Sequence, residues 1–324
     1  MKIMSILYGS MPRSRRLARA LSRYYSQKIS LEALDEIYRK ELKRYIDFTL
    51  TYNFFRVSDG MFRWDDLFNP LAEYMKIPVN GLKRFYDNNF FFRQPVFKEK
   101  IRYETPVISE TLTKDLKLIG SLDRINRISI SLPGPATLVA NSLIEGSSYT
   151  STNDLARDYI EKVVLKEAEN AYKQGFRHID LHEPELASEN VKADDYIDLY
   201  KRVSEYFRGF IWIPIYFGYN SHNIKILAEE LRDTNIILII DLATKNIDIE
   251  KLRNDLSKTK AVGVGLINSR NTKMEKIAYI REYVATLEKT LSNIEDLYLT
   301  HNTNLEFLPE KVAYKKIRLL SKFT

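Results

Sequence analysis

The sequence predicts an α/β protein built as a (β/α)8 barrel, with residues 1–324 forming one domain. Eight β-rich runs alternate with helical patterns over a length that suits a single barrel. One closing helix follows the last run and no glycine-rich dinucleotide fingerprint is present, which disfavours the alternative of a doubly wound sheet. The predicted strands are 2–8, 54–57, 127–131, 178–181, 211–216, 236–240, 261–266 and 297–299.

Helical patterns lie between the later strands. The clearest covers residues 154–174, where apolar residues recur at the spacing of one helix face. Asn153 or Thr152 can cap its start, and Gly175 can end it. Further helices are predicted at 193–206, 223–232, 249–256 and 274–291, with a last one from Pro309.

Residues 81–100 do not fit a bare barrel. Six aromatic residues are mixed there with Asp, Asn and Arg. We therefore expect an inserted aromatic-rich hairpin or extended excursion in this stretch.

The chain has a net charge of +7 and no cysteine. Disulfides are thereby excluded, and without an export signal we expect a cytoplasmic location. The best apolar run, 236–240, has the length of a strand, so no membrane partner is expected. The positive charge suits an anionic partner, yet no nucleic-acid-binding module is recognised. The densest basic cluster, residues 13–28, fits either an anion-binding surface or a solvated helix face.

In a barrel of this kind, chemistry takes place at the carboxyl ends of the strands. Polar or glycine-rich sequences follow six of the predicted strands, and barrel closure would bring them to one face. These sequences are Gly9-Ser10, Ser58-Asp59-Gly60, Pro133-Gly134-Pro135, His182-Glu183, Asp241 and Asn268-Ser269-Arg270-Asn271.

His182 and Glu183 form either an acid/base pair or a structural element. In the structural interpretation, Glu183 binds backbone donors at the strand end while His182 packs or faces solvent. Asp59 and Arg63 can bind a zwitterionic ligand together. The neighbouring Asp65 and Asp66 can instead lie in the first turn of a helix that begins near Trp64.

Arg270, Asn271 and Lys273 stand just before the predicted helix 274–291. Their donors can hold a carboxylate or phosphate at that helix N-terminus, and Asn271 or Thr272 can also cap the helix. For a metal, the histidines and nearby carboxylates are the available ligands, but no HxH, HExxH or CxxC spacing exists. We expect no metal site.

An ordered series of motifs resembles the cobalamin-independent methionine synthase family over nearly the whole chain. The motifs are Tyr8-Gly9-Ser10-Met11-Pro12-Arg13, the run 57–66, the run 81–89, Leu132-Pro133-Gly134-Pro135, Ile179-Asp180-Leu181-His182-Glu183-Pro184, Arg270-Asn271-Thr272-Lys273 and Leu305-Glu306-Phe307-Leu308-Pro309. The resemblance implies a barrel that transfers a methyl group from a folate or corrinoid donor to homocysteine, which a zinc ion activates.

The sequence departs from the family where the resemblance places this chemistry. The family's zinc ligands after the fifth strand would fall at 215–219, where neither His nor Cys occurs, and its last cysteine falls at Thr303. Asp241 stands at the position of the glutamate ligand. Of the homocysteine-binding residues, Ser10 is retained, whereas Met61 replaces a glutamate and His182 an aspartate.

The leading hypothesis is therefore a methionine-biosynthesis barrel, similar to the family's non-catalytic N-terminal barrel, that lacks its own zinc site. It would support methyl transfer to homocysteine by a separate zinc-bearing catalytic barrel, and whether it has activity of its own is left open. One alternative is an active methyltransferase with remodelled ligands. The other is a binding module for a folate polyglutamate or another anion, with Arg63, Arg93, Arg270 and Lys273 as candidates. No cofactor or catalytic residue is assigned, and the candidate ligand-binding residues are Ser10, Asp59, Arg63, His182, Glu183, Asp241, Arg270, Asn271 and Lys273.

Overall fold

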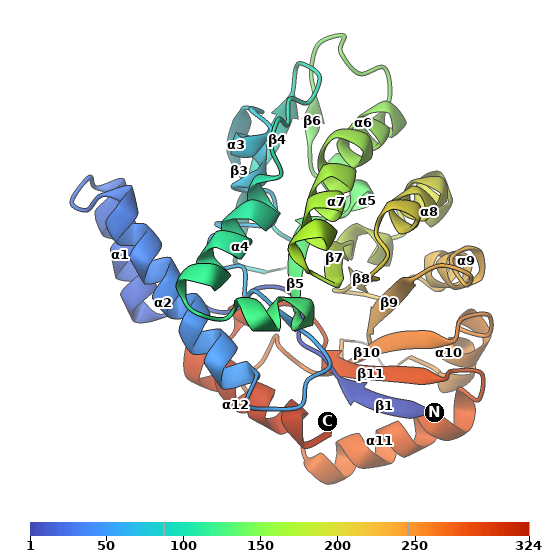
Figure 1. Cartoon of the computed structure of the whole chain (residues 1–324). Helices are drawn as coiled ribbons and strands as arrows, with labels where there is room; N and C mark the ends of the chain where they lie inside the picture. Colours follow the sequence, from blue (N-terminus) through green and yellow to red (C-terminus); the bar gives the residue numbers. More distant parts are fainter. Residues whose placement is uncertain (87, 245–246, 324) are drawn as a thin grey trace.

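A computed structural model describes residues 1–86, 88–244 and 247–323. Eight parallel strands form one curled, TIM-barrel-like sheet in the order β1-β11-β10-β9-β8-β7-β5-β2 (Figure 1). Two isolated parallel bridges, Ile6–Arg56 and Ser10–Gly60, join the first and last strands of this order, so the sheet edges meet. The strands are β1 Lys2–Ser5, β2 Val57–Ser58, β5 Ile128–Pro133, β7 His178–His182, β8 Phe210–Ile215, β9 Ile236–Asp241, β10 Ala261–Ile267 and β11 Asp296–His301.

All eight predicted strands are confirmed, with shifts at their ends. Each runs parallel to its neighbours, for example with Ile130 of β5 beside Ile179 of β7. Their nearly continuous apolar runs are typical of parallel strands that are covered on both faces.

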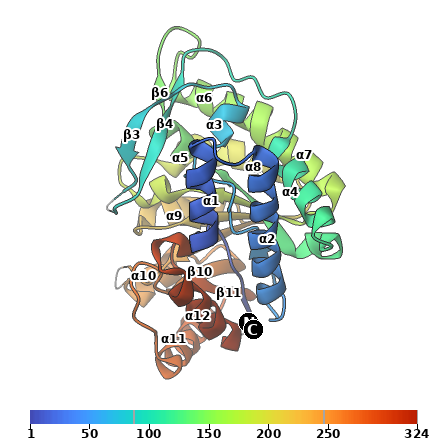
Figure 2. The same ribbon diagram turned by 90° about the vertical axis from the view of Figure 1, so that its left-hand side faces the viewer.

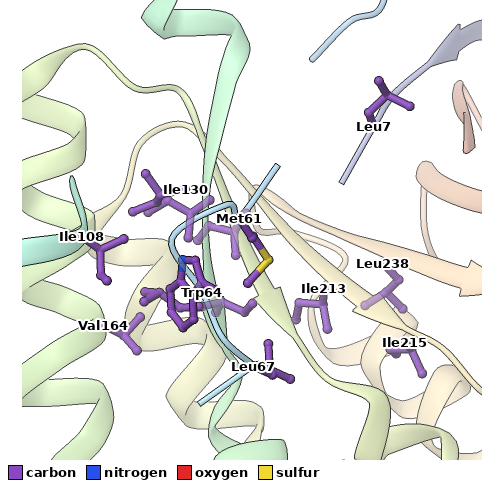
Figure 3. Packing of buried hydrophobic residues seen from close by; sticks show 14 of the residues in the cluster. Leu7, Met61, Trp64, Leu67, Ile108, Ile130, Val164, Ile213, Ile215 and Leu238 are labelled. Carbon is purple, nitrogen blue, oxygen red and sulfur yellow. The ribbon is translucent and has the colours of Figure 1, made fainter. Parts of the chain in front are cut away.

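Side chains alternate between two cores along each strand. In β8, Ile211, Ile213 and Ile215 belong to the outer core between sheet and helices, whereas Trp212 belongs to the barrel interior. Figure 3 shows Ile213 among the outer residues, near Leu238 of β9. This period of two follows from the pleat of a strand, and it places every second strand residue inside the barrel.

A buried ion pair lies in the barrel interior. Arg56 and Asp180 approach to 2.8 Å with both side chains fully buried. The Arg56 guanidinium also lies over the Trp212 ring, 4.4 Å from its centroid. The barrel centre is thus packed by this pair and by aromatic rings.

The helices surround the sheet, and several begin where the sequence predicts. The predicted helix 154–174 is confirmed as a helical stretch that a π turn at Ile160–Val164 divides, and Gly175 ends it at a φ of 111°. Ser151, and neither Thr152 nor Asn153, caps its start. The helices are α1 Arg15–Tyr25, α2 Leu31–Thr49, α3 Leu71–Tyr74, α4 Val107–Leu118, α5 Pro135–Ala140, α6 Thr152–Tyr159, α7 Leu165–Gln174, α8 Ile197–Tyr206, α9 Ser221–Glu230, α10 Ile249–Asp255, α11 Ile277–Thr290 and α12 Glu310–Leu320.

One helix start that the sequence left open is absent, and one predicted helix begins later than expected. No helix begins near Trp64, because the Asp66 carboxylate there accepts bonds from the amides of Phe68, Asn69 and Arg93 and so holds a loop. Helix α11 starts at Ile277, three residues after the predicted Met274.

The inserted hairpin is confirmed. Strands β3 (Val79–Arg84) and β4 (Phe91–Phe97) pair antiparallel, and β6 (Leu143–Ile144) adds a third strand. Asp87, within the predicted stretch, lies outside the described residues. The hairpin stands beyond the barrel strands, on the side that also carries α1 and α3 (Figure 2). Across the described ranges, no helix combines the length and apolar character needed to cross a membrane.

Candidate functional site

The carboxyl ends of the strands open toward α1, α2 and the hairpin. In Figure 1, β1 runs from the labelled N-terminus toward this side, and Figure 2 views the molecule from there. Residues that follow β1, β2, β5, β7, β9 and β11 gather here, as barrel closure requires.

Ser10 lines a small cavity between the end of β1 and the hairpin. The cavity measures about 30 Å³, and Met61, Asn304, Glu306 and the hairpin residue Phe90 also line it. The Ser10 amide donates to Asn304 Oδ1 at 3.3 Å, and the Ser10 side chain interacts with the Glu306 carboxyl. Burial raises the pKa of the Glu306 carboxyl. A space of this size holds a few water molecules.

Asp59 and Arg63 lie together, but in a different cavity. This one, of about 40 Å³, lies outside the barrel, and Tyr38 of α2 and Asp115 of α4 help to line it. Burial raises the pKa of Asp59 to about 7.

The Arg63 guanidinium is held by protein carboxylates. It donates to Asp115 at 2.8 and 3.1 Å and to Asp35 at 2.6 Å, and it stacks over Tyr38 at 4.7 Å. Arg63 therefore joins α2, α4 and the loop after β2, and an anionic ligand would have to compete with two carboxylates.

Glu183 follows β7 and binds the first turn of α5. Its carboxylate accepts from the amides of Ala136 at 3.0 Å and Thr137 at 2.7 Å, and from the Tyr200 hydroxyl at 2.5 Å. Gly134 leaves room for it, since a Cβ there would lie 2.1 Å from Glu183 Oε1. Burial raises the pKa of Glu183 to about 7. These contacts match the structural interpretation, in which Glu183 binds backbone donors at the strand end.

His182 points into the barrel, away from these partners. Its imidazole Nδ1 lies 3.4 Å from the Tyr216 hydroxyl, and its ring centroid lies 5.9 Å from that of Tyr8. Burial lowers its pKa to about 3, so the ring is neutral near pH 7. Because His182 and Glu183 contact different groups, the structure does not bring them together as an acid/base pair.

Asp241, at the end of β9, is surrounded by donors. Its carboxylate accepts from the amides of Ala243 and Thr244, from the Thr244 hydroxyl at 2.5 Å and from Asn302 Nδ2 at 3.1 Å. Burial raises its pKa. Thr303, the position of the family's last cysteine, is fully buried and its hydroxyl has no partner.

The donor set here does not fit a zinc ion. The chain has no thiolate to offer, and the Asp241 oxygens already accept four hydrogen bonds. Within residues 1–86, 88–244 and 247–323, no three His, Asp or Glu side chains are grouped as metal ligands. Structural and catalytic zinc sites in proteins use three or four such ligands.

Arg270, Asn271 and Lys273 lie in the loop before α11. The adjacent Ser269 donates to Asn302, which in turn donates to Asp241. Asn271 Oδ1 accepts from the Lys273 amide at 3.0 Å, which closes a local turn. Arg270 lies over the Phe217 ring at 5.4 Å. Helix α11 starts at Ile277 with Lys276 as its N-cap residue, so neither Asn271 nor Thr272 caps it.

Sequence reasoning missed the aromatic cluster that fills the mouth of the barrel. Tyr8, His182, Tyr216 and His301 are at most 1% exposed. The Tyr8 ring stacks on His301 with centroids 4.5 Å apart, and it lies 6.3 Å from Tyr216. The alternation of inward residues could have placed Tyr8 and His301 inside the barrel, although not their contact.

The comparisons with known proteins agree with this architecture. Residues 48–292 match the family described as cobalamin-independent synthase, N-terminal domain. A methionine synthase from Sulfurisphaera tokodaii is 25% identical over 321 residues, which cover 98% of this chain and 90% of that protein. A methionine synthase from Sulfolobus acidocaldarius is 23% identical over 315 residues, which cover 95% and 87% respectively.

Two solved structures share the fold. A B12-independent methionine synthase from Shewanella sp. W3-18-1 in complex with selenomethionine has a TM-score of 0.74 at 20% identity, covering 98% of this chain and 95% of that one. A putative vitamin-B12 independent methionine synthase from Listeria monocytogenes has a TM-score of 0.74 at 18% identity, covering 100% and 98%. Since the family match spans most of the sequence, this chain belongs to the cobalamin-independent methionine synthase family and is of its N-terminal-domain type.

Proposed function

We propose that this barrel acts in methionine biosynthesis without a zinc site of its own, as the partner of a separate zinc-bearing catalytic barrel that methylates homocysteine. Family membership supports the pathway, and relatives named methionine synthase align over most of their length. We infer from the site that the catalytic zinc belongs to the second barrel and that this barrel supports it.

The observation that carries the proposal is the filled mouth of the barrel. Tyr8, His182, Tyr216 and His301 occupy the space inside the strand ends and pack against one another. A substrate thiol and a metal would need this space, which the four buried rings occupy.

The groups around Ser10 support the same conclusion. Met61, which stands where the family resemblance expects a glutamate, is buried and lines the same cavity as Ser10. An amino-acid ammonium placed there would lose the counter-charge of that glutamate and would depend on Asp65, Asp66 and Glu306, which also line the cavity. Burial raises the pKa of Glu306 and so disfavours its charged form. Without a metal, a thiol with an ordinary pKa near 8.5 also stays mostly protonated at pH 7.

The test is co-elution with the catalytic homologue. Both proteins are purified separately, mixed and passed over a size-exclusion column, and the zinc content of each fraction is measured. We expect a complex whose zinc comes from the catalytic barrel alone. Two separate peaks at micromolar concentrations of both proteins would refute the proposal.

A second candidate is a methyltransferase with remodelled ligands, and one observation favours it. Four buried polar atoms at the barrel mouth lack hydrogen-bond partners: Tyr8 Oη, His182 Nε2, His301 Nε2 and Thr303 Oγ1. Unpaired buried polar groups are costly and call for an explanation, and a bound polar ligand is one. Stoichiometric metal in the purified protein, together with homocysteine turnover by the protein alone, would establish this candidate over the first.

A further inference from the structure

The excess of positive over negative charge arises at the beginning of the chain. The first 31 residues contain seven Lys or Arg and no Asp or Glu, out of 50 basic and 43 acidic residues in the chain. The remaining residues therefore hold 43 of each sign. The net charge of +7 thus arises within one segment, which includes α1.

Most of these charges are exposed and unpaired on and beside α1. Arg15, Arg16, Arg19 and Arg23 project from the helix, and Lys28 follows it; all five are exposed. No carboxylate of the described residues forms an ion pair with any of them. We call these five side chains the α1 basic surface.

The neighbouring helix α2 forms no ion pair with this surface, and of its carboxylates Glu36 interacts electrostatically with Arg16. Its Asp35 pairs with Arg63 at 2.6 Å, Glu36 pairs with Lys40 at 2.5 Å, and Glu41 pairs with Arg44 at 2.7 Å. Other helices pair their cations internally, as Lys173 does with Glu169. Helix α1 has no acidic residue with which to do so.

The arrangement is unfavourable for α1 taken alone. Arg19 is four residues from both Arg15 and Arg23, and like charges at this spacing repel. Arg15 and Arg16 occupy the first turn, where the helix dipole is positive. The helix is held instead by its buried Leu17 and Leu21 and by the Ser14 cap. An acidic surface docked against α1 would relieve both effects.

The location of α1 indicates what docks there. Figure 2 shows α1 in front of the strand ends, on the same side as the hairpin. On that hairpin Leu82 is 67% exposed and Phe91 53% exposed. A face that combines cations with exposed aliphatic and aromatic side chains suits a protein partner, which can offer both acidic and apolar groups. A nucleic-acid backbone offers the anions alone.

We propose that the α1 basic surface docks onto an acidic face of the zinc-bearing catalytic barrel and steers the association of the two proteins. This inference rests on the proposed function and deepens it by naming the surface and the charge of its partner. Complementary charge of this kind raises association rates and sets orientation.

The test compares two variants of equal charge by measuring their affinity for the purified catalytic barrel. The first variant carries Arg15→Gln, Arg16→Gln, Arg19→Gln and Arg23→Gln. The control carries Lys225→Gln, Lys251→Gln, Lys258→Gln and Lys289→Gln, four exposed lysines on or near α9, α10 and α11. Circular dichroism checks that both remain folded.

We expect the α1 variant to bind at least about tenfold more weakly in 0.1 M salt and to lose most of its salt dependence, while the control stays within about twofold of the wild type. Equal affinities of wild type and α1 variant would overturn the α1 inference and leave the proposed function intact. A wild type that does not bind the catalytic barrel would overturn both. The wild type could also bind a single-stranded RNA oligonucleotide more tightly than it binds the catalytic barrel. If the α1 variant lost that RNA binding, the surface would be reassigned to nucleic acid and the inference overturned.

Discussion

The Tyr8 ring stacks on the imidazole of His301 with centroids 4.5 Å apart and planes inclined by 20°. The two residues come from opposite ends of the chain and meet because β1 pairs with β11. Their contact lies at the carboxyl ends of the strands, where TIM barrels place their reactive groups. The centre of this end of the barrel is therefore occupied by the protein itself.

Tyr8→Phe tests whether the mouth is a packed core. The Tyr8 hydroxyl is buried without a partner, so its removal should leave stability unchanged or raise it by up to about 1 kcal/mol. Tyr8→Leu, which removes the stacked ring, should cost about 2–4 kcal/mol. Urea unfolding at neutral pH measures both changes. A loss of more than about 1 kcal/mol in Tyr8→Phe would mean that the hydroxyl binds a water or ligand, which would favour the second candidate function.

Asp59→Asn should remove a pH dependence of stability. The pKa of Asp59 is about 7 in the folded protein against an ordinary value of 3.8. A raised folded pKa means that the folded state binds the proton more tightly, so wild-type stability should fall as pH rises from about 4 to 7 and then level off. The Asn variant should lack the Asp59 part of this decline, keep the part due to Glu183, whose pKa is also raised to about 7, and exceed the wild type by roughly 2–4 kcal/mol at pH 8.

Urea unfolding of both proteins at pH 5 and pH 8 measures the effect of Asp59. The Asn side chain can still accept the bond that the Met61 amide donates to Asp59 Oδ1. Equal pH dependence in the two proteins would show that Asp59 ionises normally.

Arg63 and Asp115 should be coupled in a double-mutant cycle. Their side chains are 25% and 5% exposed and share two hydrogen bonds, so we expect a coupling energy of about 2 kcal/mol. The exposed pair Lys173–Glu169, 68% and 57% accessible, is the matched control and should give about 0.3–0.5 kcal/mol. Similar values for both pairs would contradict the view that Arg63 is a structural clamp.

Gly9→Ala should disturb the loop that carries Ser10. Gly9 has a φ of 65°, and a Cβ there would lie 1.9 Å from Asn304 Oδ1. We expect a loss of at least about 2 kcal/mol in unfolding free energy. Gly81→Ala is the control, since nothing lies within 4 Å of its Cβ position, and it should change stability by less than about 0.5 kcal/mol. A Gly9 variant as stable as this control would show that the loop adapts.

The strands could be read from the sequence because their signal is local. Runs such as 236–240 are apolar throughout, which is how a parallel strand covered on both faces looks. The hairpin was also predictable, because aromatic residues are mixed there with Asp, Asn and Arg. Helix boundaries were harder, because side-chain bonds decide them: Asp66 holds a loop where a helix seemed to begin.

The candidate site depended on contacts between distant residues, which one sequence does not reveal. Ser10, His182 and Asp241 do come to the same end of the barrel, as strand order requires. However, Arg63 is held by Asp35 and Asp115, and Glu183 is held by Ala136, Thr137 and Tyr200. These partners lie 17 to 52 positions away in the chain, so pattern and spacing gave no sign of them.

The most direct test of the account is methionine formation as this protein is titrated into a fixed concentration of the catalytic barrel, with homocysteine and a methyl donor present. We predict no methionine from this protein alone and a saturable rise in rate on mixing, with a midpoint equal to the measured affinity of the complex. Methionine formation by this protein alone, or a rate that does not change across the titration, would contradict the account.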